Sequence, residues 1–183
     1  MRAKRLTDAN EATVSRAVLA LTALRSILEQ AYPTQPSGSN IPRSTGQCAV
    51  SALIVQVQFG GELTSARVCD ESHWFNRIVQ GDTVFDVDVT GDQFGLPAIQ
   101  CRPRDALYTP SQRRKLLDVT PETFARAIAL ARCCGLAGAT SALLTAARSV
   151  ALERFLQAKD HEDTGEKAEG DDARHEPRRP PFF

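Results

Sequence analysis

The sequence predicts an α+β protein in which a short helix bearing a cysteine packs on a small antiparallel sheet, with further helices at the C-terminal end. Three observations predict this class. Apolar residues recur at steps of three and four over 9–31 and 46–60, which is typical of helices. Three short β-like runs then follow one another: ELTSARV, HWFNRIV and TVFDVDV. Helical patterns return after Thr120.

The first two helices are separated by a predicted surface loop. Helix 9–31 has Asp8 and Glu11 near its start, in the manner of a capping box. Segment 32–45 carries three prolines and a glycine and should be irregular. Ser44 or Thr45 would cap the second helix, which Gly60-Gly61 ends, so Cys48 is expected in its first turn.

The last two β-like runs form a predicted hairpin around Gln80-Gly81-Asp82, and its register decides which residues meet. If residues 80 and 81 are central, His73 lies opposite Asp88; if residues 81 and 82 are central, His73 faces Thr90 and Asp88 is its diagonal neighbour. Either register brings an imidazole and a carboxylate together. Asp86 points the same way along the strand and is the alternative partner.

The C-terminal half is predicted to be helical and then disordered. After GDQFGLP the pattern is irregular, until a helix starts at Thr120-Pro121 and ends at Gly135. Another helix is expected over about 139–158. We therefore expect one domain over 1–157, with a core at 46–94 and a helical appendage at 120–157. Segment 158–183 is charged and poor in apolar residues, so it is expected to be disordered.

Composition excludes several classes of partner. The 22 basic and 22 acidic residues balance, so neither nucleic acid nor an anionic membrane is favoured. No apolar stretch is long enough for a spanning helix, and we expect a cytoplasmic protein. Five cysteines form no CxxC pair; Cys69-x3-His73 has the spacing of zinc ligands, but no second pair completes it. No metal or cofactor is expected.

Cys48 is the candidate nucleophile. At a helix start, the helix dipole and unpaired N–H groups stabilise a thiolate. His73 could take the thiol proton while Asp88 orients the ring, and the Gln47 amide could stabilise an oxyanion. Three other interpretations stay open: Cys48 as a packing thiol in the core, His73 and Asp88 as a structural pair, and Gln47 as a polar residue at the helix N-terminus without a role in the reaction. Near His73, Trp74 and Asn76 are substrate-adjacent candidates, although core packing is the simpler interpretation of Trp74.

The strings GQCAVSALIVQVQFGGEL, SHWFNRI and FDVDVTGDQF, within residues 46–94, resemble the YunG family of small bacterial proteins without a characterised function. The order of Cys, His and Asp is similar, more distantly, to transglutaminase-like and papain-like cysteine enzymes. That resemblance implies a papain-like fold, with Cys48 as nucleophile, His73 as general base and acid, and Asp88 as orienting carboxylate.

The resulting expectation is a cysteine-dependent hydrolase or acyltransferase that acts on an amide or thioester bond of a peptide, a protein or a small molecule. The alternative is a non-catalytic binding or adaptor protein on a papain-like frame, with the C-terminal helices and tail as contact surfaces. A zinc-stabilised regulatory domain ranks third.

Overall fold

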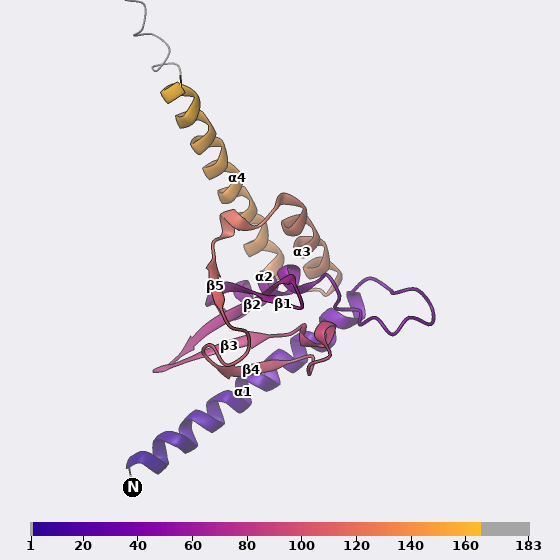
Figure 1. Cartoon of the computed structure of the whole chain (residues 1–183), viewed down its shortest axis with the longest axis vertical. Helices are drawn as coiled ribbons and strands as arrows, with labels where there is room; N and C mark the ends of the chain where they lie inside the picture. The colour runs from indigo at the N-terminus through magenta and orange to yellow at the C-terminus, as the bar shows by residue number, and fades with distance from the viewer. Residues whose placement is uncertain (1, 166–183) are drawn as a thin grey trace, which may run out of the picture. The chain divides into compact units, whose positions relative to one another are not determined.

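The computed structural model describes residues 2–165, and the side chains of residues 15–160 (Figure 1). The chain divides into two compact units, of which the first ends at Ala147 and the second starts at Arg148. The first unit holds the sheet and the candidate site, and the second continues the last helix.

The described elements are helices and one antiparallel sheet, so the predicted α+β class is confirmed. The helices are α1 (Arg2–Ala31), α2 (Cys48–Phe59), α3 (Pro121–Cys133) and α4 (Ala137–Gly165), with short 3-10 turns η1 (Gly91–Phe94) and η2 (Leu116–Asp118). The strands are β1 (Glu62–Val68), β2 (Glu71–Gln80), β3 (Thr83–Asp88), β4 (Gln100–Pro103) and β5 (Ser111–Arg114). They form a five-stranded sheet in the order β4-β3-β2-β1-β5.

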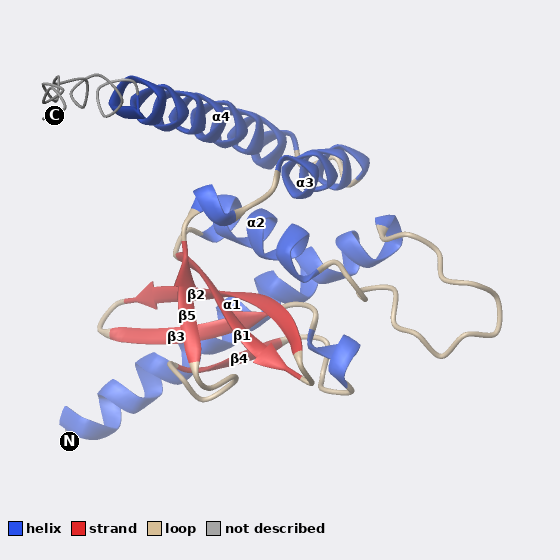
Figure 2. Cartoon of the chain, turned by 45° about the horizontal axis from the view of Figure 1, so that its top comes forward, coloured by secondary structure: helices blue, strands red, loops and turns tan. Residues whose placement is uncertain are grey.

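Helix α2 lies on one face of this sheet (Figure 2). Its residues 50–55 are all buried, which suits a helix that is apolar on most sides and packs against α3 as well as β2. Asn76 of β2 donates a hydrogen bond from Nδ2 to the carbonyl of Ala52, at 2.9 Å. The sheet thus holds the helix that begins at Cys48 by a buried polar contact in addition to apolar packing.

The hairpin register is the second of the two predicted ones. Asn76 pairs with Val87 and Gln80 with Thr83, so Gly81 and Asp82 form the two-residue loop. Strand β1 has its predicted bounds, and β2 and β3 differ from theirs by at most two residues. As a result, Asp88 lies diagonal to His73 on the same face of the sheet, as that register requires.

Two helices are longer than predicted. Helix α1 begins at Arg2, so Asp8 and Glu11 lie inside it and the predicted capping box is wrong. Helix α4 continues to Gly165, which makes residues 158–165 of the predicted disordered tail helical. No proline or glycine interrupts the chain between Gly138 and Gly165, so nothing in the backbone ends the helix earlier. Residues 166–183 of the tail lie outside the described residues.

Strands β4 and β5 occupy the two edges of the sheet, in a region where the sequence predicted irregular chain. Their sequences, QCRP and SQRR, are four residues long and lack the apolar alternation that marks a strand. β4 pairs with β3, and β5 pairs with β1. Edge strands of this kind are specified by their neighbours more than by their own side chains.

Candidate functional site

A tight turn delivers Cys48 to the start of α2. The N–H of Gln47 donates to the carbonyl of Ser44 at 2.8 Å, and Gly46, at the third position of this turn, has φ +72°. Gln47 is the N-cap residue and Cys48 the first residue of the helix, so the predicted caps Ser44 and Thr45 are wrong. Ser44 Oγ donates instead to Asp92 Oδ1, at 2.7 Å.

His73 and Asp88 form a buried pair beside that thiol. Nε2 of His73 lies 2.8 Å from Oδ2 of Asp88, and both side chains are almost completely buried. The Cys48 thiol, which is half-buried, lies close enough to the His73 ring to interact with it. Because Nε2 faces Asp88, Nδ1 is the nitrogen that can exchange a proton with the sulfur.

Three residues supply four hydrogen-bond donors to Asp88. Besides His73, the phenol of Tyr108 donates to Oδ2 at 2.7 Å. The backbone N–H and the hydroxyl of Thr90 donate to Oδ1, at 2.8 and 2.9 Å. Burial and the neighbouring Asp88 raise the pKa of Tyr108, so its hydroxyl keeps its proton. Such an array holds the carboxylate in one orientation against the His73 ring.

Aromatic rings enclose the imidazole. Phe94 and Tyr108 meet His73 edge to face, with ring centroids 4.8 and 4.9 Å away. Burial alone would lower the pKa of His73, but the hydrogen bond to Asp88 and the adjacent Cys48 outweigh it and raise that pKa to about 9. The site therefore favours an imidazolium next to the sulfur.

Gln93 is a site residue that was not among the candidates predicted from the sequence. Its Nε2 donates to the carbonyl of Thr90 at 2.9 Å and lies 3.4 Å from Nδ1 of His73. An amide N–H can donate only to a ring nitrogen without a proton, so this contact fits the neutral ring with its proton on Nε2; when Nδ1 takes the thiol proton, Gln93 keeps its bond to Thr90. The only signal in the sequence was the block D-x-T-x2-Q-F, in which Gln93 follows Thr90 by one helical turn.

The structure separates Trp74 and Asn76 from this cluster. The Asn76 amide binds the α2 backbone, and Trp74 stacks with Arg114, whose guanidinium carbon is 5.6 Å from the ring centroid. Alternate residues of a strand point to opposite faces, so both lie on the face of β2 away from His73. Trp74 and Asn76 were expected next to the reacting groups, but their side chains lie on the other face of the strand.

Asp86 is occupied by a different partner. Its carboxylate accepts from Arg77 Nε and Nη2, at 2.8 and 3.1 Å, and from the N–H of Asp105, at 2.6 Å. Arg77 also pairs with the Asp105 carboxylate, at 2.7 Å. The alternative in which Asp86 orients His73 is therefore wrong, because this carboxylate is held by the arginine directly across the hairpin.

The zinc hypothesis gains no support from the positions of its ligands. Cys69 is exposed in the β1–β2 turn, while His73 is enclosed and engaged by Asp88. Within residues 15–160, no three His, Cys, Asp or Glu side chains are grouped as metal ligands would be.

The described helices also include none with the length and hydropathy of a transmembrane span.

An apolar cavity of about 320 Å³ lies elsewhere in the first unit. Its lining comes from α1, the end of α2 and strands β2 to β4, and includes Phe59, Phe85 and Cys101. Cys48, His73 and Asp88 do not line it. The cavity is therefore separate from the candidate site.

Comparison with known proteins identifies relatives but no established activity. The uncharacterised protein YunG of Bacillus subtilis (strain 168) is 34% identical over 82 residues, which are 44% of this chain and 63% of that protein. No solved structure matches the chain. The family described as "YunG protein" matches residues 20–127, a range that includes Cys48, His73, Asp88 and Gln93. The chain therefore belongs to the YunG family.

Proposed function

We propose that the protein is a cysteine-dependent hydrolase or acyltransferase that acts on an amide or thioester bond through Cys48, His73 and Asp88. One observation carries the proposal: a half-buried thiol at a helix start lies beside an imidazole whose far nitrogen is held by a buried carboxylate at 2.8 Å. Nucleophile, base and orienting group of a thiol enzyme are arranged in this way.

The resting site would be a thiolate–imidazolium pair. The thiol proton moves to Nδ1 of His73, and Asp88 stabilises the resulting positive charge through Nε2–H. The N-terminal end of α2 stabilises the thiolate through its dipole and its free N–H groups. The raised pKa of His73 supports a protonated imidazole at neutral pH.

Acyl transfer to the enzyme follows from that pair. The sulfur of Cys48 attacks the substrate carbonyl carbon, a C–S bond forms, and the carbonyl electrons move to oxygen as an oxyanion. The oxyanion collapses, the bond to the leaving nitrogen or sulfur breaks, and His73 gives its proton from Nδ1 to the leaving group. The enzyme is left as a thioester on Cys48 with a neutral His73.

Release of the acyl group needs a second nucleophile. Water attacks the thioester and gives a carboxylic acid in a hydrolase, whereas an amine attacks and gives a new amide in an acyltransferase. In both cases His73 accepts the proton of the nucleophile and the Cys48 thiolate leaves. Each cycle thus returns the starting pair, and no redox partner is required.

A papain-like frame is part of the same proposal. Its support is the chain order of a cysteine at a helix start, a histidine on β2 and an aspartate on β3, the next strand. A cytoplasmic location is proposed as well, since all five cysteines are free thiols, as is usual in a reducing compartment. Peptides, proteins and small amides or thioesters all stay candidate substrates.

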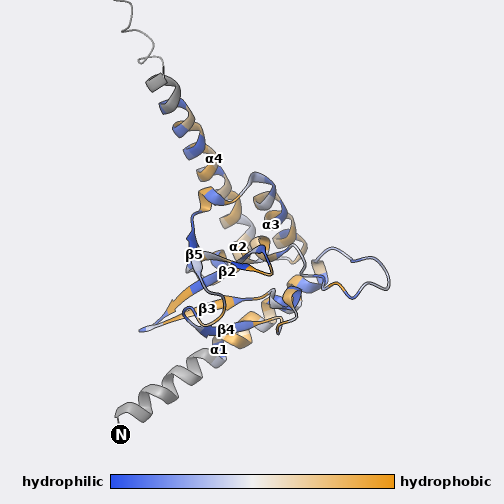
Figure 3. Cartoon of the chain, in the orientation of Figure 1, coloured by the Kyte–Doolittle hydropathy of each residue, from blue (hydrophilic) through white to orange (hydrophobic). Residues whose placement is uncertain are grey.

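A binding or adaptor protein is the second candidate, and the second unit favours it. Three large apolar side chains of α4 lie at helical spacing and are exposed: Leu152 (60%), Phe155 (65%) and Leu156 (51%). Figure 3 shows hydrophobic and hydrophilic residues along this part of the helix. Exposed apolar clusters on a helix commonly mark contact with another protein.

Thiol labelling separates the two candidates. Iodoacetamide should alkylate Cys48 near neutral pH much faster than Cys133, which is more exposed but has no imidazole partner among the described residues. His73→Gln should remove the difference, because it removes the base while it keeps an amide that can donate to Asp88. Peptide mapping by mass spectrometry measures both rates.

Equal labelling of Cys48 and Cys133 in the unmodified chain would contradict the enzyme and favour the adaptor. His73 is completely buried, so unfolding of the variant is a concern. Asp88→Asn serves as a second variant, since it keeps the shape of the pair and removes the charge. A urea unfolding curve of each variant shows whether a loss of labelling reflects chemistry or folding.

A further inference from the structure

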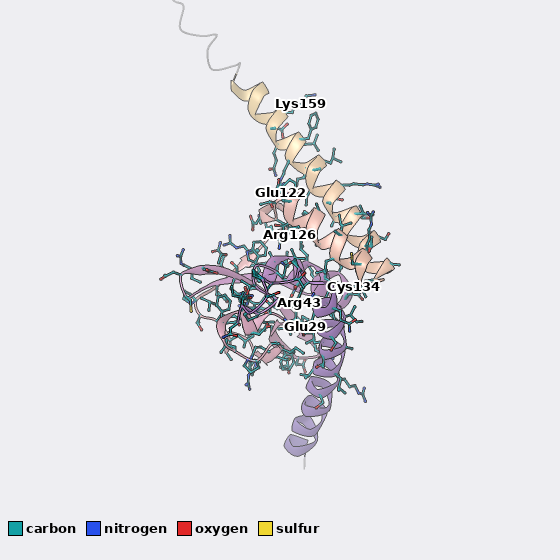
Figure 4. All side chains as sticks on the ribbon, turned by 90° about the vertical axis from the view of Figure 1, so that its right-hand side faces the viewer. Glu29, Arg43, Glu122, Arg126, Cys134 and Lys159 are labelled. Carbon is teal, nitrogen blue, oxygen red and sulfur yellow. The ribbon has the colours of Figure 1, made fainter. Side chains whose placement is uncertain are left out.

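We infer that Arg126 of α3 is a positioning residue, which holds the amide of Gln47 so that its NH2 group faces the developing oxyanion on a Cys48-bound substrate. The inference rests on the proposed function. It adds Arg126, which is 78 positions after Cys48 in the sequence, to the residues that support the reaction. Figure 4 labels Arg126 on α3.

Two contacts tie Arg126 to the turn before Cys48. Its Nη2 donates to the carbonyl of Gly46 at 2.8 Å and to Oε1 of Gln47 at 3.0 Å. A guanidinium can only donate, so the oxygen of the Gln47 amide must face Arg126. The orientation of this amide, which is often ambiguous, is therefore fixed by chemistry.

The amide nitrogen of Gln47, Nε2, is the polar atom of this side chain for which no acceptor is found among the described residues. The Gln47 side chain as a whole is buried. The fully buried side-chain atoms without a partner, among the described residues, do not include this nitrogen. It therefore keeps some exposure to solvent. A donor of this kind, one residue before the nucleophile, is available to a ligand bound at Cys48.

Orientation decides whether Gln47 helps or hinders the reaction. When Nε2 faces the substrate, the amide donates to the oxyanion together with the N–H groups at the start of α2, which have no acceptor within the helix. If the amide group were rotated by half a turn, Oε1 would face the substrate instead, and its lone pair would repel the negative oxygen. The bond to Gly46 also steadies the turn, in which φ is +72°.

Two electrophiles separate this role from activation of the thiol. Iodoacetamide forms a C–S bond at a saturated carbon as iodide leaves, so no oxyanion develops. p-Nitrophenyl acetate is attacked at its carbonyl, passes through an oxyanion and releases p-nitrophenolate, which leaves an acetyl thioester on the sulfur. Loss of an oxyanion donor should slow only the second reaction.

The experiment compares Arg126→Met, Gln47→Ala and the double variant of the full chain. Each should acetylate Cys48 about tenfold or more slowly than the unmodified chain, and each should react with iodoacetamide at a rate within about twofold of it. The double variant should be no slower than Gln47→Ala, because Arg126 acts through Gln47. Arg132→Met, an exposed arginine of the same helix, is the matched control and should leave both rates unchanged.

The outcomes distinguish the inference from the function on which it rests. An unchanged acetylation rate in Arg126→Met, or an equal loss of both rates, would overturn the positioning role and leave the thiol enzyme standing. Additive losses in the double variant would also overturn it. If Cys48 of the unmodified chain reacts no faster than Cys133 with iodoacetamide, the proposed function fails, and the role of Arg126 fails with it.

Discussion

Asp88 shows how much one residue depends on contacts that are distant in sequence. The cross-strand arithmetic predicted that an acid would lie near His73, but it left Asp86 and Asp88 as rivals on the same face. The register with Gly81 and Asp82 in the loop sets Arg77 directly across from Asp86. The pairing of Arg77 with Asp86 could have been predicted from this register, and it would have excluded Asp86 as the partner of His73. The contact of Tyr108 with Asp88 could not have been predicted, because Tyr108 lies in a loop.

Removal of the Tyr108 hydroxyl tests the support of Asp88. Tyr108→Phe should destabilise the fold by about 1–2 kcal/mol, because a buried carboxylate loses one of its four donors while the aromatic packing is kept. Urea unfolding measures the change. Tyr32→Phe is the matched control: it removes a buried phenol whose hydrogen-bond partner among the described residues is the neutral Ser51, so its cost should be about 1 kcal/mol or less. A larger loss in the control would contradict the special weight given to Asp88.

The pKa of His73 makes stability depend on pH. The folded-state pKa of about 9 lies above the ordinary value of 6.5, so protonation of His73 stabilises the fold. That contribution is complete below about pH 6.5 and is lost as the pH rises through about 9. Urea unfolding between these values should show a fall in stability that His73→Gln reduces. Equal slopes in the two proteins would mean that the ring is neutral in the fold.

At the scale of elements, the turn before α2 explains why a glycine precedes Gln47 and Cys48. A positive φ at Gly46 is costly for other residues, and apart from its two chain neighbours no atom lies within 4 Å of the position a Cβ would take. The cost of a side chain is therefore conformational and not steric. The sequence placed Cys48 in the first turn of the helix, but the caps it predicted were wrong because Ser44 binds Asp92, a partner in η1.

Gly46→Ala tests this turn. The variant should be less stable by about 1–2 kcal/mol, since alanine pays the full cost of the left-handed region. Gly46→Asn should lose less, because asparagine tolerates that region better. Gly138→Ala in α4 is the control: its φ is ordinary, no atom crowds the site, and the change should stabilise by up to about 1 kcal/mol. Equal effects at both glycines would contradict the argument.

Among its attachments to the sheet, the loop between β4 and β5 is held by the ion pair of Asp105 with Arg77 and by the hydrogen bond from Tyr108 to Asp88. Arg77→Met should destabilise by about 3–5 kcal/mol, because it leaves the fully buried Asp86 without a cation. Arg77→Met with Asp86→Asn should recover part of the loss. Urea unfolding measures both, and a neutral single variant would contradict the buried ion pair.

For the whole molecule, the sequence predicted the elements with strong periodicity and missed those set by context. α2, α3 and the β1–β3 meander follow from apolar spacing and turn residues. The edge strands β4 and β5 and the length of α4 do not, because their pairing or continuity depends on neighbours and on the absence of a breaker. The family match ends at residue 127, so all of α4 lies beyond it.

Truncation tests the predicted domain limit at residue 157. A chain without residues 158–183 should keep its free energy of unfolding within about 0.5 kcal/mol, because residues 158–160 are exposed and the remaining sequence is poor in apolar residues. Cys48 should react with iodoacetamide as before. A large loss of stability would show that this segment packs on the rest of the chain.

Helix α1 contributes a buried cation, Arg25, to the segment that follows Asp88. Arg25 donates to the Val89 carbonyl and to both oxygens of Asp92, and Asp92 in turn accepts from Ser44. A shortened protein that began after residue 31 would keep Cys48, His73 and Asp88, yet Asp92 would lose its counter-ion. The three groups all lie downstream of α1, yet through Arg25 that helix is bonded to the residue after Asp88 and, by way of Asp92 and Ser44, to the turn before Cys48.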